Sequence, residues 1–246
     1  MNSAYHIIYL DKVDSTNTYL KNHPELWEHD LITVVAAEQT GGRGRHTRKW
    51  HSEPGLDLTF STLCIPPRPL NDPSCITIIA GLGVYRCLRR YCDKGLNLKW
   101  PNDILYGNKK IGGILCEMVP KHGAPAVIIG IGININTTAF PDEISSTASS
   151  LKAVTGKEHD VFTICEGILD EIGVLMRDFR VPLDRLLLDE WINASASIGR
   201  KVLFYNNGRE ESGVISGINP DGSLVLVSST GDRIDSYKDE IIYKLE

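Results

Sequence analysis

Four short apolar runs follow one another in the segment LNLKWPNDILYGNKKIGGILCEMVPKHGAPAVIIGIGIN, which covers residues 96–134. Each run is rich in leucine, isoleucine or valine and is bounded by Gly, Pro, Asn or Asp, which is typical of buried strands joined by turns. The dipeptide Gly107-Asn108 is a hairpin signal between two of these runs. We therefore predict successive strands over Leu96–Trp100, Ile104–Tyr106, Lys110–Met118 and Ala126–Asn134.

The residues before this segment predict further strands and two helices. Asp14-Ser15 offers an N-cap to a short helix over Thr16–Asn22. Asn71-Asp72-Pro73 precedes a core helix whose apolar residues recur with helical spacing at Ile76, Ile79, Ala80, Val84, Leu88 and Tyr91. Gly41–His51 lacks an apolar period before Trp50 and is predicted to be a loop. The additional strands are His6–Leu10, Leu31–Ala37 and Leu56–Ile65, the last of them ended by Pro66–Pro69.

The pattern changes near residues 194–198. Two amphipathic helices, Phe162–Phe179 and Leu183–Asn193, precede this point. Short strands separated by turns at 206–208, 220–222 and 230–232 follow it. They are predicted over Val202–Tyr205, Gly213–Ile218, Ser223–Val227 and Arg233–Tyr237. We therefore predict an α+β protein with a mixed-sheet domain over residues 1–196 and a small β-barrel domain over 197–246.

Composition narrows the class of protein. The chain has 246 residues, of which 42% are hydrophobic and 23% charged, so a disordered or collagenous protein is excluded. Its net charge of −5 predicts no bulk attraction to nucleic acid or to anionic membranes. No secretory signal or membrane-spanning run is readable. The six cysteines show no metal-binding spacing, which favours reduced thiols and a cytoplasmic location.

The most distinctive segment for function is QTGGRGRHTRKW, residues 39–50. It holds four cations, Arg43, Arg45, Arg48 and Lys49, and no acidic residue. Its three glycines allow close backbone approach to a ligand, and arginine suits phosphate or carboxylate oxygens. From the loop alone, a solvated basic loop or an arginine-glycine contact to nucleic acid explains the pattern equally well.

The next candidate segment runs from Lys99 to the glycine pair Gly112-Gly113. Lys99-Trp100-Pro101-Asn102-Asp103 forms a corner between strands, where proline fixes the turn and the Asn and Asp side chains point outward. Asp103 is a candidate magnesium ligand near phosphates, and Lys110 follows seven residues later. The alternative is that Asn102 and Asp103 only cap the turn and that Lys110 is a surface lysine.

Two more polar segments carry candidate ligands. In Gly130-Ile131-Gly132-Ile133-Asn134-Ile135-Asn136, the glycines mark a bulge or a close backbone approach, and Asn134 and Asn136 share one face. In Asp14-Ser15-Thr16-Asn17, a helix cap is the simpler reading. The hydroxyls and backbone N–H groups there also suit a polar ligand group. For the segment Gly130–Asn136, the alternative is that the Asn134 and Asn136 amides bond only to the local backbone.

Taken together, these segments resemble the biotin protein ligase family. The resemblance rests on Asp14–Asn17, Gly42–Arg45 with Arg48–Trp50, Lys99–Asp103, Lys110–Leu115 and Gly132–Asn134, and it extends over essentially the whole chain. It implies a class II synthetase-like catalytic domain of the biotin/lipoate ligase type and an SH3-like barrel. It also implies two reactions. Biotin first attacks the α-phosphate of Mg-ATP to give biotinyl-5′-AMP, and a lysine of a biotin carboxyl carrier domain then takes the biotinyl group.

The resemblance also assigns candidate roles, with Lys110 and Arg45 as catalytic residues. Biotin contacts are expected from Ser15, Thr16, Asn17, Gln39, Arg43, Gly44, Arg45, Lys110, Gly112 and Gly113. Nucleotide contacts are expected from Arg43, Arg48, Trp50, Asn102 and Asn134, with Asp103 toward Mg²⁺. The glycine-arginine loop is expected to act as a lid over the adenylate.

This chain departs from the family pattern at Thr47, where many members have glycine, and the β-branched residue is expected to stiffen the loop. There is no room for a DNA-binding domain before Tyr5, so no operator binding is expected. A homodimer is compatible with the pattern. The alternatives are a lipoate or octanoate ligase, whose Arg-Arg-x-x-Gly-Gly-Gly pattern is missing here, a nucleic-acid-binding module and a non-catalytic sensor of biotin or adenylate.

Overall fold

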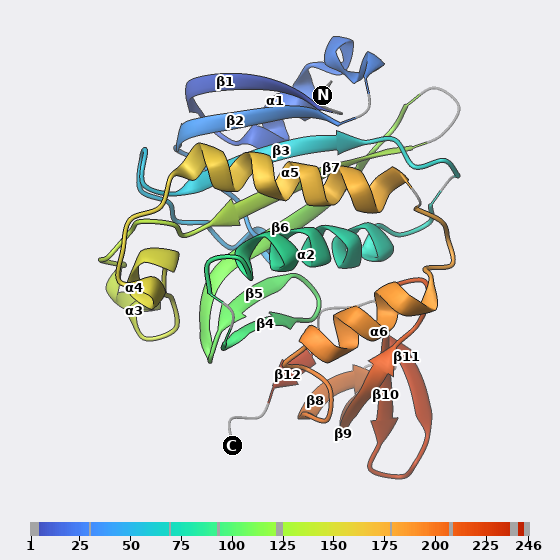
Figure 1. The fold of residues 1–246 in the computed structure, drawn as a ribbon. Helices are drawn as coiled ribbons and strands as arrows, with labels where there is room; N and C mark the ends of the chain where they lie inside the picture. The colour runs from blue at the N-terminus through green and yellow to red at the C-terminus, as the bar shows by residue number, and fades with distance from the viewer. Residues whose placement is uncertain are drawn as a thin grey trace.

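A seven-stranded mixed sheet forms the centre of the protein in the computed structural model (Figure 1). The structure describes residues 5–29, 31–68, 70–92, 94–121, 125–177, 179–206, 209–236 and 241–243. The strand order is β1-β2-β3-β7-β6-β5-β4; β1 and β2 are parallel and all other pairs are antiparallel. The strands are β1 (His6–Val13), β2 (Ile32–Gln39), β3 (Leu58–Cys64), β4 (Leu96–Lys99), β5 (Asp103–Tyr106), β6 (Lys109–Val119) and β7 (Ala126–Ile133).

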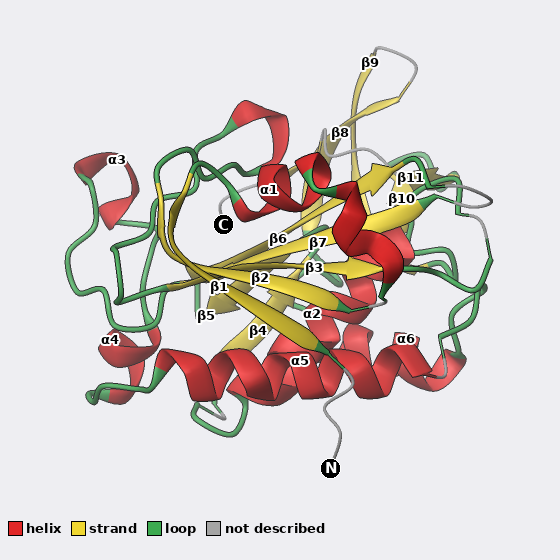
Figure 2. Ribbon diagram, turned by 90° about the horizontal axis from the view of Figure 1, so that it is seen from above, coloured by secondary structure: helices red, strands yellow, loops and turns green. Residues whose placement is uncertain are grey.

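Helices cover the two faces of this sheet unequally (Figure 2). The long helices α2 (Ser74–Leu88) and α5 (Val161–Arg177) lie on one face, where the larger apolar core forms. The short helix α1 (Thr16–Asn22) and the 3-10 helix η1 (Pro24–Glu28) lie on the other, over a smaller apolar cluster. Much of the second face is therefore left for loops and polar side chains.

Helix α2 is buried on nearly all sides because the sheet, α5 and α6 (Arg185–Ala194) surround it. Gly83 permits the close approach of α5, since a Cβ there would lie 2.7 Å from Ile172 Cγ1. The helix begins at Ser74, so Pro73 lies at the N-cap position and not in the first turn as predicted, and the Asp72 carboxylate accepts a hydrogen bond from Ser74 N at 2.8 Å. The predicted period extended to Tyr91, but the helix ends at Leu88.

A five-stranded antiparallel sheet follows α6, in the order β11-β10-β9-β8-β12. It packs against the corner after β4. Ala196 N donates to Leu98 O at 2.8 Å, and the buried Trp100 indole donates to Gly222 O at 3.2 Å. Its strands are β8 (Lys201–Asn206), β9 (Arg209–Ile218), β10 (Leu224–Ser228), β11 (Arg233–Ser236) and β12 (Ile241–Tyr243).

The α+β architecture with a mixed sheet and a small C-terminal β-sheet agrees with the prediction. Sequence patterns missed η1, the 3-10 turn η2 (Arg45–Thr47), β12 and the short helices α3 (Asp142–Ser145) and α4 (Leu151–Thr155). Parts of the predicted turn at 206–208 and Tyr237 lie outside the described residues. In the part of the chain that the structure describes, no helix is long and apolar enough to cross a bilayer.

Candidate active site

The candidate site lies on the sheet face that α2 and α5 leave open. Gly113 in β6 is directly opposite Gly132 in β7, so both face the same side. A Cβ on Gly132 would lie 2.4 Å from the Trp50 indole, and one on Gly113 would lie 3.3 Å from it. The two glycines therefore form a floor on which the indole of Trp50 rests.

Gly112 has a different position from its neighbour. A Cβ there would meet Ile133 Cδ1 at 2.5 Å and Ile104 Cβ at 3.3 Å, and both side chains belong to the main core. The sequence predicted that both glycines of the pair line the biotin wall. The structure places only Gly113 toward the loop, because successive residues of a strand point to opposite faces.

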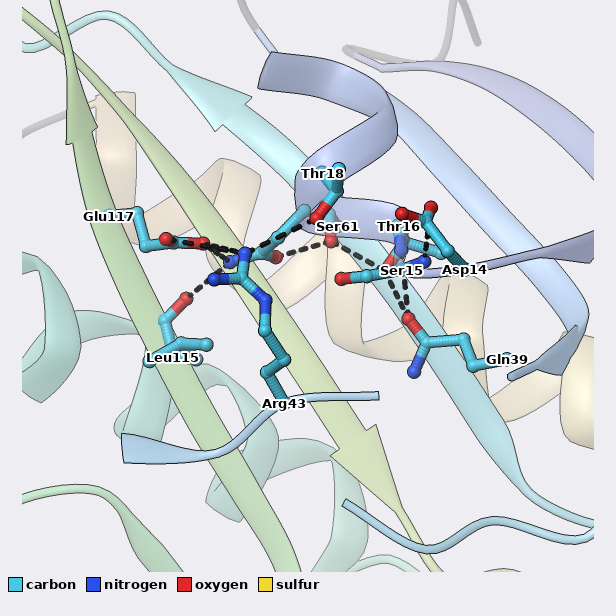
Figure 3. Close-up of polar contacts among 10 residues, drawn as sticks. Asp14, Ser15, Thr16, Thr18, Gln39, Arg43, Ser61, Leu115 and Glu117 are labelled. Carbon is cyan, nitrogen blue, oxygen red and sulfur yellow. Dashed lines mark hydrogen bonds and ion pairs between the residues drawn. The ribbon is translucent and has the colours of Figure 1, made fainter. Parts of the chain in front are cut away.

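A buried polar chain begins at the first turn of α1 (Figure 3). Gln39 Oε1, from the end of β2, accepts hydrogen bonds from Thr16 N at 2.8 Å and Thr16 Oγ1 at 3.1 Å. Ser61 Oγ, from β3, lies 2.6 Å from Thr16 Oγ1 and donates to it or to Asn17. Ser15 is at the predicted cap position, but its side chain forms no capping bond. Gln39 provides the cap from a distant strand instead.

Asn17 is the second branch of this network. Its Oδ1 accepts from Ser61 at 2.6 Å, and its Nδ2 donates to Glu117 Oε2 at 2.7 Å and to Leu115 O at 3.2 Å. Both atoms of the carboxamide are therefore fixed in orientation. Gly130 makes room for this side chain, because a Cβ there would lie 2.2 Å from Asn17 Oδ1.

Arg43 connects the glycine-arginine loop to this network. Its guanidinium lies 3.2 Å from Glu117 Oε2 and donates to Thr18 Oγ1 at 3.3 Å (Figure 3). Sequence reasoning gave no role to Thr18, Ser61 or Glu117. Ser61 carried a weak signal, since it is a polar residue that alternates with the apolar residues of a buried strand. Thr18 and Glu117 carried none.

The loop folds back on itself as a narrow turn. Gly44 N donates to Arg48 O at 2.7 Å and Trp50 N donates to Gly42 O at 2.9 Å. At the tip, His46 adopts a left-handed conformation with φ of 51°, which is uncommon for a residue other than glycine. The loop prediction is confirmed, with the addition of the 3-10 turn.

Trp50 and Lys110 meet over the glycine floor. Lys110 Nζ lies 5.6 Å from the centroid of the indole and forms an ion pair with the Asp103 carboxylate. Trp50 Nε1 is buried and has no hydrogen-bond partner among the residues that the structure describes. Burial lowers the pKa of nearby Lys99; Asp103 raises that pKa, and Lys110, Arg200 and Arg48 lower it further. The corner after β4 is therefore rich in positive charge.

The two predicted nucleotide-side asparagines bond to the backbone. Asn102 Nδ2 donates to Ile114 O at 2.6 Å, which fastens the corner to β6. Asn134 Nδ2 donates to Ser149 O at 2.9 Å, whereas its buried Oδ1 accepts no hydrogen bond from the described part of the chain. The simpler reading therefore fits Asn102, while Asn134 keeps one polar atom available to a ligand.

Two cavities lie beside the loop. A cavity of about 500 Å³ includes Gln39, Arg43, Arg48 and Trp50 in its lining. A smaller one of about 60 Å³ is lined by Arg45, Asn102 and the start of α2. Of the predicted catalytic pair, Lys110 contacts Asp103 and Trp50, and Arg45 lines the smaller cavity.

The predicted magnesium position has one carboxylate, that of Asp103, and Lys110 is paired with it. Among the described residues, no group of three or more His, Cys, Asp or Glu side chains could hold a metal ion. Mg²⁺ commonly takes one or two protein carboxylates and completes its shell with phosphates and water. The residues thus fit an ion carried by a nucleotide, and they form no preassembled metal site.

Comparison with known proteins gives consistent matches. Residues 9–134 match the model of the biotin/lipoate A/B protein ligase family. A bifunctional ligase/repressor BirA of Bacillus spizizenii is 33% identical over 92% of this chain and 70% of its own length. A biotin–[acetyl-CoA-carboxylase] ligase of Paracoccus denitrificans is 28% identical over 92% and 95%. A biotin protein ligase of Aquifex aeolicus, solved with biotin and ATP, has a TM-score of 0.83 and 28% identity, covering 98% of this chain and 99% of that one.

Proposed function

The chain belongs to the biotin/lipoate A/B protein ligase family, and we propose how its residues carry out the ATP-dependent attachment of biotin to a protein. It is a ligase, and its substrates are biotin and ATP. The observation that carries the proposal is the buried chain from Ser61 through Thr16 to Gln39, which ends beside a cation-rich loop. The neutral ureido ring of biotin would find hydrogen-bond partners in the buried chain, and the carboxylate of biotin would find cations in the loop.

The side-chain amides of Gln39 and Asn17 have different proposed roles in the biotin pocket. Thr16 occupies Gln39 Oε1 twice, so the Gln39 amide group turns its Nε2 donor toward Gly42 and the larger cavity. That donor suits the ureido oxygen of biotin. Asn17 has both polar atoms engaged, and we assign it to holding the pocket rather than to direct contact. The apolar ring and chain of biotin would lie on the floor of Gly113 and Gly132.

Adenylation brings two anions together. A carboxylate oxygen of biotin bonds to the α-phosphorus, the bond from that phosphorus to the bridging oxygen breaks, and the electron pair leaves on pyrophosphate. We assign Lys110 and Arg48 to offsetting the repulsion and stabilising charge on the phosphate oxygens. For Lys110 to act there, its ion pair with Asp103 must open or be shared with the phosphate. When bound with the nucleotide, Mg²⁺ supplies further neutralisation, and Asp103 is its proposed protein ligand.

The loop over the site is proposed to retain the adenylate. Trp50 covers the glycine floor, and Arg43 ties the loop to Glu117. Arg45 begins the turn that would close over the nucleotide, and Gly44 directly precedes it. Excluding water protects the acyl-phosphate bond until a lysine amine arrives, displaces AMP and forms an amide. Asn134 Oδ1 and Trp50 Nε1 are the buried atoms proposed to meet the nucleotide.

The protein substrate is proposed to be the biotin carboxyl carrier domain of an acetyl-CoA carboxylase, as the name of the Paracoccus relative suggests. A homodimer formed through an edge of the seven-stranded sheet stays a prediction, and so does a cytoplasmic location. The division into two domains, residues 1–196 and 197–246, is likewise a proposal, made because amphipathic helices give way to short strands at that point of the sequence.

Pyrophosphate exchange into ATP tests the first half-reaction without the carrier. Parallel reactions contain biotin, lipoate or octanoate as the acid. We expect exchange with biotin alone, because Gln39 and the loop provide partners for a ureido ring that the other acids lack. Exchange with lipoate or octanoate instead of biotin would contradict the assignment, and so would the absence of exchange with all three.

A further inference from the structure

Lys99 lies on the same face of the sheet as the glycine floor. Strand pairing aligns Lys99 of β4 with Asp103 of β5, Asp103 with Gly113 of β6, and Gly113 with Gly132 of β7. Directly opposed residues of neighbouring strands point to the same side. At a strand spacing of about 4.8 Å, Lys99 begins roughly 10 Å from Gly113 along this row. Its side chain thus extends the candidate site beyond Asp103 and Lys110.

Cations gather around Lys99. The residue is partly buried, and Lys110, Arg200 and Arg48 lower the pKa of its ammonium group, whereas the Asp103 carboxylate raises it. That carboxylate also pairs with Lys110. Bringing several like charges together costs free energy, and a ligand with several negative oxygens would offset that cost. The corner therefore suits a polyanion better than a single carboxylate.

Arg200 reaches this corner from the segment that leads into the small sheet. Its backbone N donates to Ser197 O at 3.1 Å, and its Nε donates to Ala196 O at 3.3 Å. The same segment is anchored to the corner, because Ser197 Oγ accepts from Trp100 N at 2.9 Å. Lys99 and Arg200 thus come from different parts of the chain, and the hydrogen bond between Trp100 N and Ser197 Oγ joins the two segments that carry them.

We propose that Lys99 and Arg200 bind the two phosphates of ATP that leave as pyrophosphate. This inference rests on the proposed function, which places the α-phosphate beside Lys110. Lys99 starts two strands beyond that point, where the rest of the triphosphate chain would extend. When the bond between the α-phosphorus and the bridging oxygen breaks, the electron pair moves to pyrophosphate. The two cations stabilise the charge that develops there.

The assignment separates the two half-reactions. Adenylation and its reversal involve pyrophosphate, whereas the transfer of biotin from biotinyl-AMP to the carrier does not. Removing either cation should therefore weaken pyrophosphate and ATP binding and leave biotin binding and the second half-reaction unchanged. A cation that only supported the fold would affect both half-reactions together.

The experiment compares Lys99→Met, Lys99→Arg and Arg200→Met with Lys109→Met, which removes an exposed cation from the neighbouring hairpin. Calorimetry measures the binding of inorganic pyrophosphate, and a second assay supplies synthetic biotinyl-AMP to the carrier. We expect each methionine variant of the proposed pair to raise the Kd for pyrophosphate by about tenfold to a hundredfold. Lys99→Arg should recover part of the affinity, and Lys109→Met should resemble the wild type.

Unchanged pyrophosphate affinity in folded Lys99→Met and Arg200→Met proteins would overturn the inference. Slower transfer from supplied biotinyl-AMP would also overturn it, because the cations would then contact the carrier. The proposed function fails separately. If the wild type showed no biotin-dependent exchange but bound pyrophosphate through Lys99, the anion subsite would stand and the biotin assignment would fall.

Discussion

Two glycines of β7 face the same side of the sheet, yet replacing each by alanine should lower the free energy of unfolding by very different amounts. A Cβ at Gly130 would lie 2.2 Å from Asn17 Oδ1, and Asn17 is buried and bonded at both ends of its carboxamide. A Cβ at Gly132 would lie 2.4 Å from the indole of Trp50, which the loop carries. The first neighbour cannot move without breaking the polar network, whereas the second can lift with the loop.

The expected cost of Gly130→Ala follows from these contacts. Overpacking in a dense interior costs about 1–3 kcal/mol. Displacing Asn17 adds about 1 kcal/mol for each of the bonds to Ser61 and Glu117. The reduced freedom of the unfolded chain returns roughly 0.5 kcal/mol. We expect the free energy of unfolding to fall by about 3 kcal/mol, or roughly 6–12 °C in Tm for a domain of this size. For Gly132→Ala we expect less than about 1 kcal/mol.

Thermal unfolding of both variants measures the difference, with Gly217→Ala as the control. Gly217 lies in β9, where a Cβ would have no atom within 4 Å. Limited trypsin digestion reports on the loop, which holds Arg43, Arg45 and Arg48. Gly132→Ala should be cut there faster than the wild type even though its Tm is nearly unchanged. Equal Tm values for Gly130→Ala and Gly217→Ala would refute the reasoning.

Four further outcomes are expected. Lys110→Ala should lower biotin-dependent pyrophosphate exchange by about 100-fold or more with little change in biotin Kd; an equal loss in both would make Lys110 a binding residue only. Arg45→Ala should speed the release of biotinyl-AMP in a filter assay, and an unchanged rate would contradict the lid. Glu117→Gln should speed release several-fold, since Arg43 loses its ionic partner, while the matched change Glu38→Gln, which removes the ionic partner of Lys12 instead, should not. Burial raises the pKa of Cys165 to about 12, so folding favours the neutral thiol. This contribution to stability is complete below pH 9 and declines as the pH rises toward 12; Cys165→Ala should flatten that decline in urea titrations.

The sequence predicted those elements whose signals are local. The predicted bounds of α1 agree with the structure because a cap residue, Ser15, directly precedes the helix and a proline, Pro24, follows shortly after its end. The helices α3 and α4 were missed because four or five residues are too few to show a helical period. The sequence predicted every strand of the central sheet, although several predicted ends differ from the observed ends by a few residues.

The polar network could not be predicted in the same way. Ser61 and Asn17 are 44 residues apart, and Glu117 is 100 residues from Asn17. These contacts exist because strand order places β3, β7 and β6 side by side under α1, and no local pattern contains that order. Local sequence patterns also could not distinguish Gly112 from Gly113, because the two residues are adjacent and of the same type. Only the register across β7 decides which of them faces the loop.

The small C-terminal sheet is tied to the adenylation site through Trp100. This side chain is 2% exposed, and its backbone and indole N–H groups donate to Ser197 and Gly222. Lys99 precedes it and the corner with Asn102 and Asp103 follows it, so these two hydrogen bonds fix the backbone between Lys99 and Asp103. Removing that sheet would expose the indole and leave both donors without these partners. We expect the side chains proposed to bind phosphate to lose their fixed positions, even though most of the residues proposed to contact biotin lie outside the small sheet.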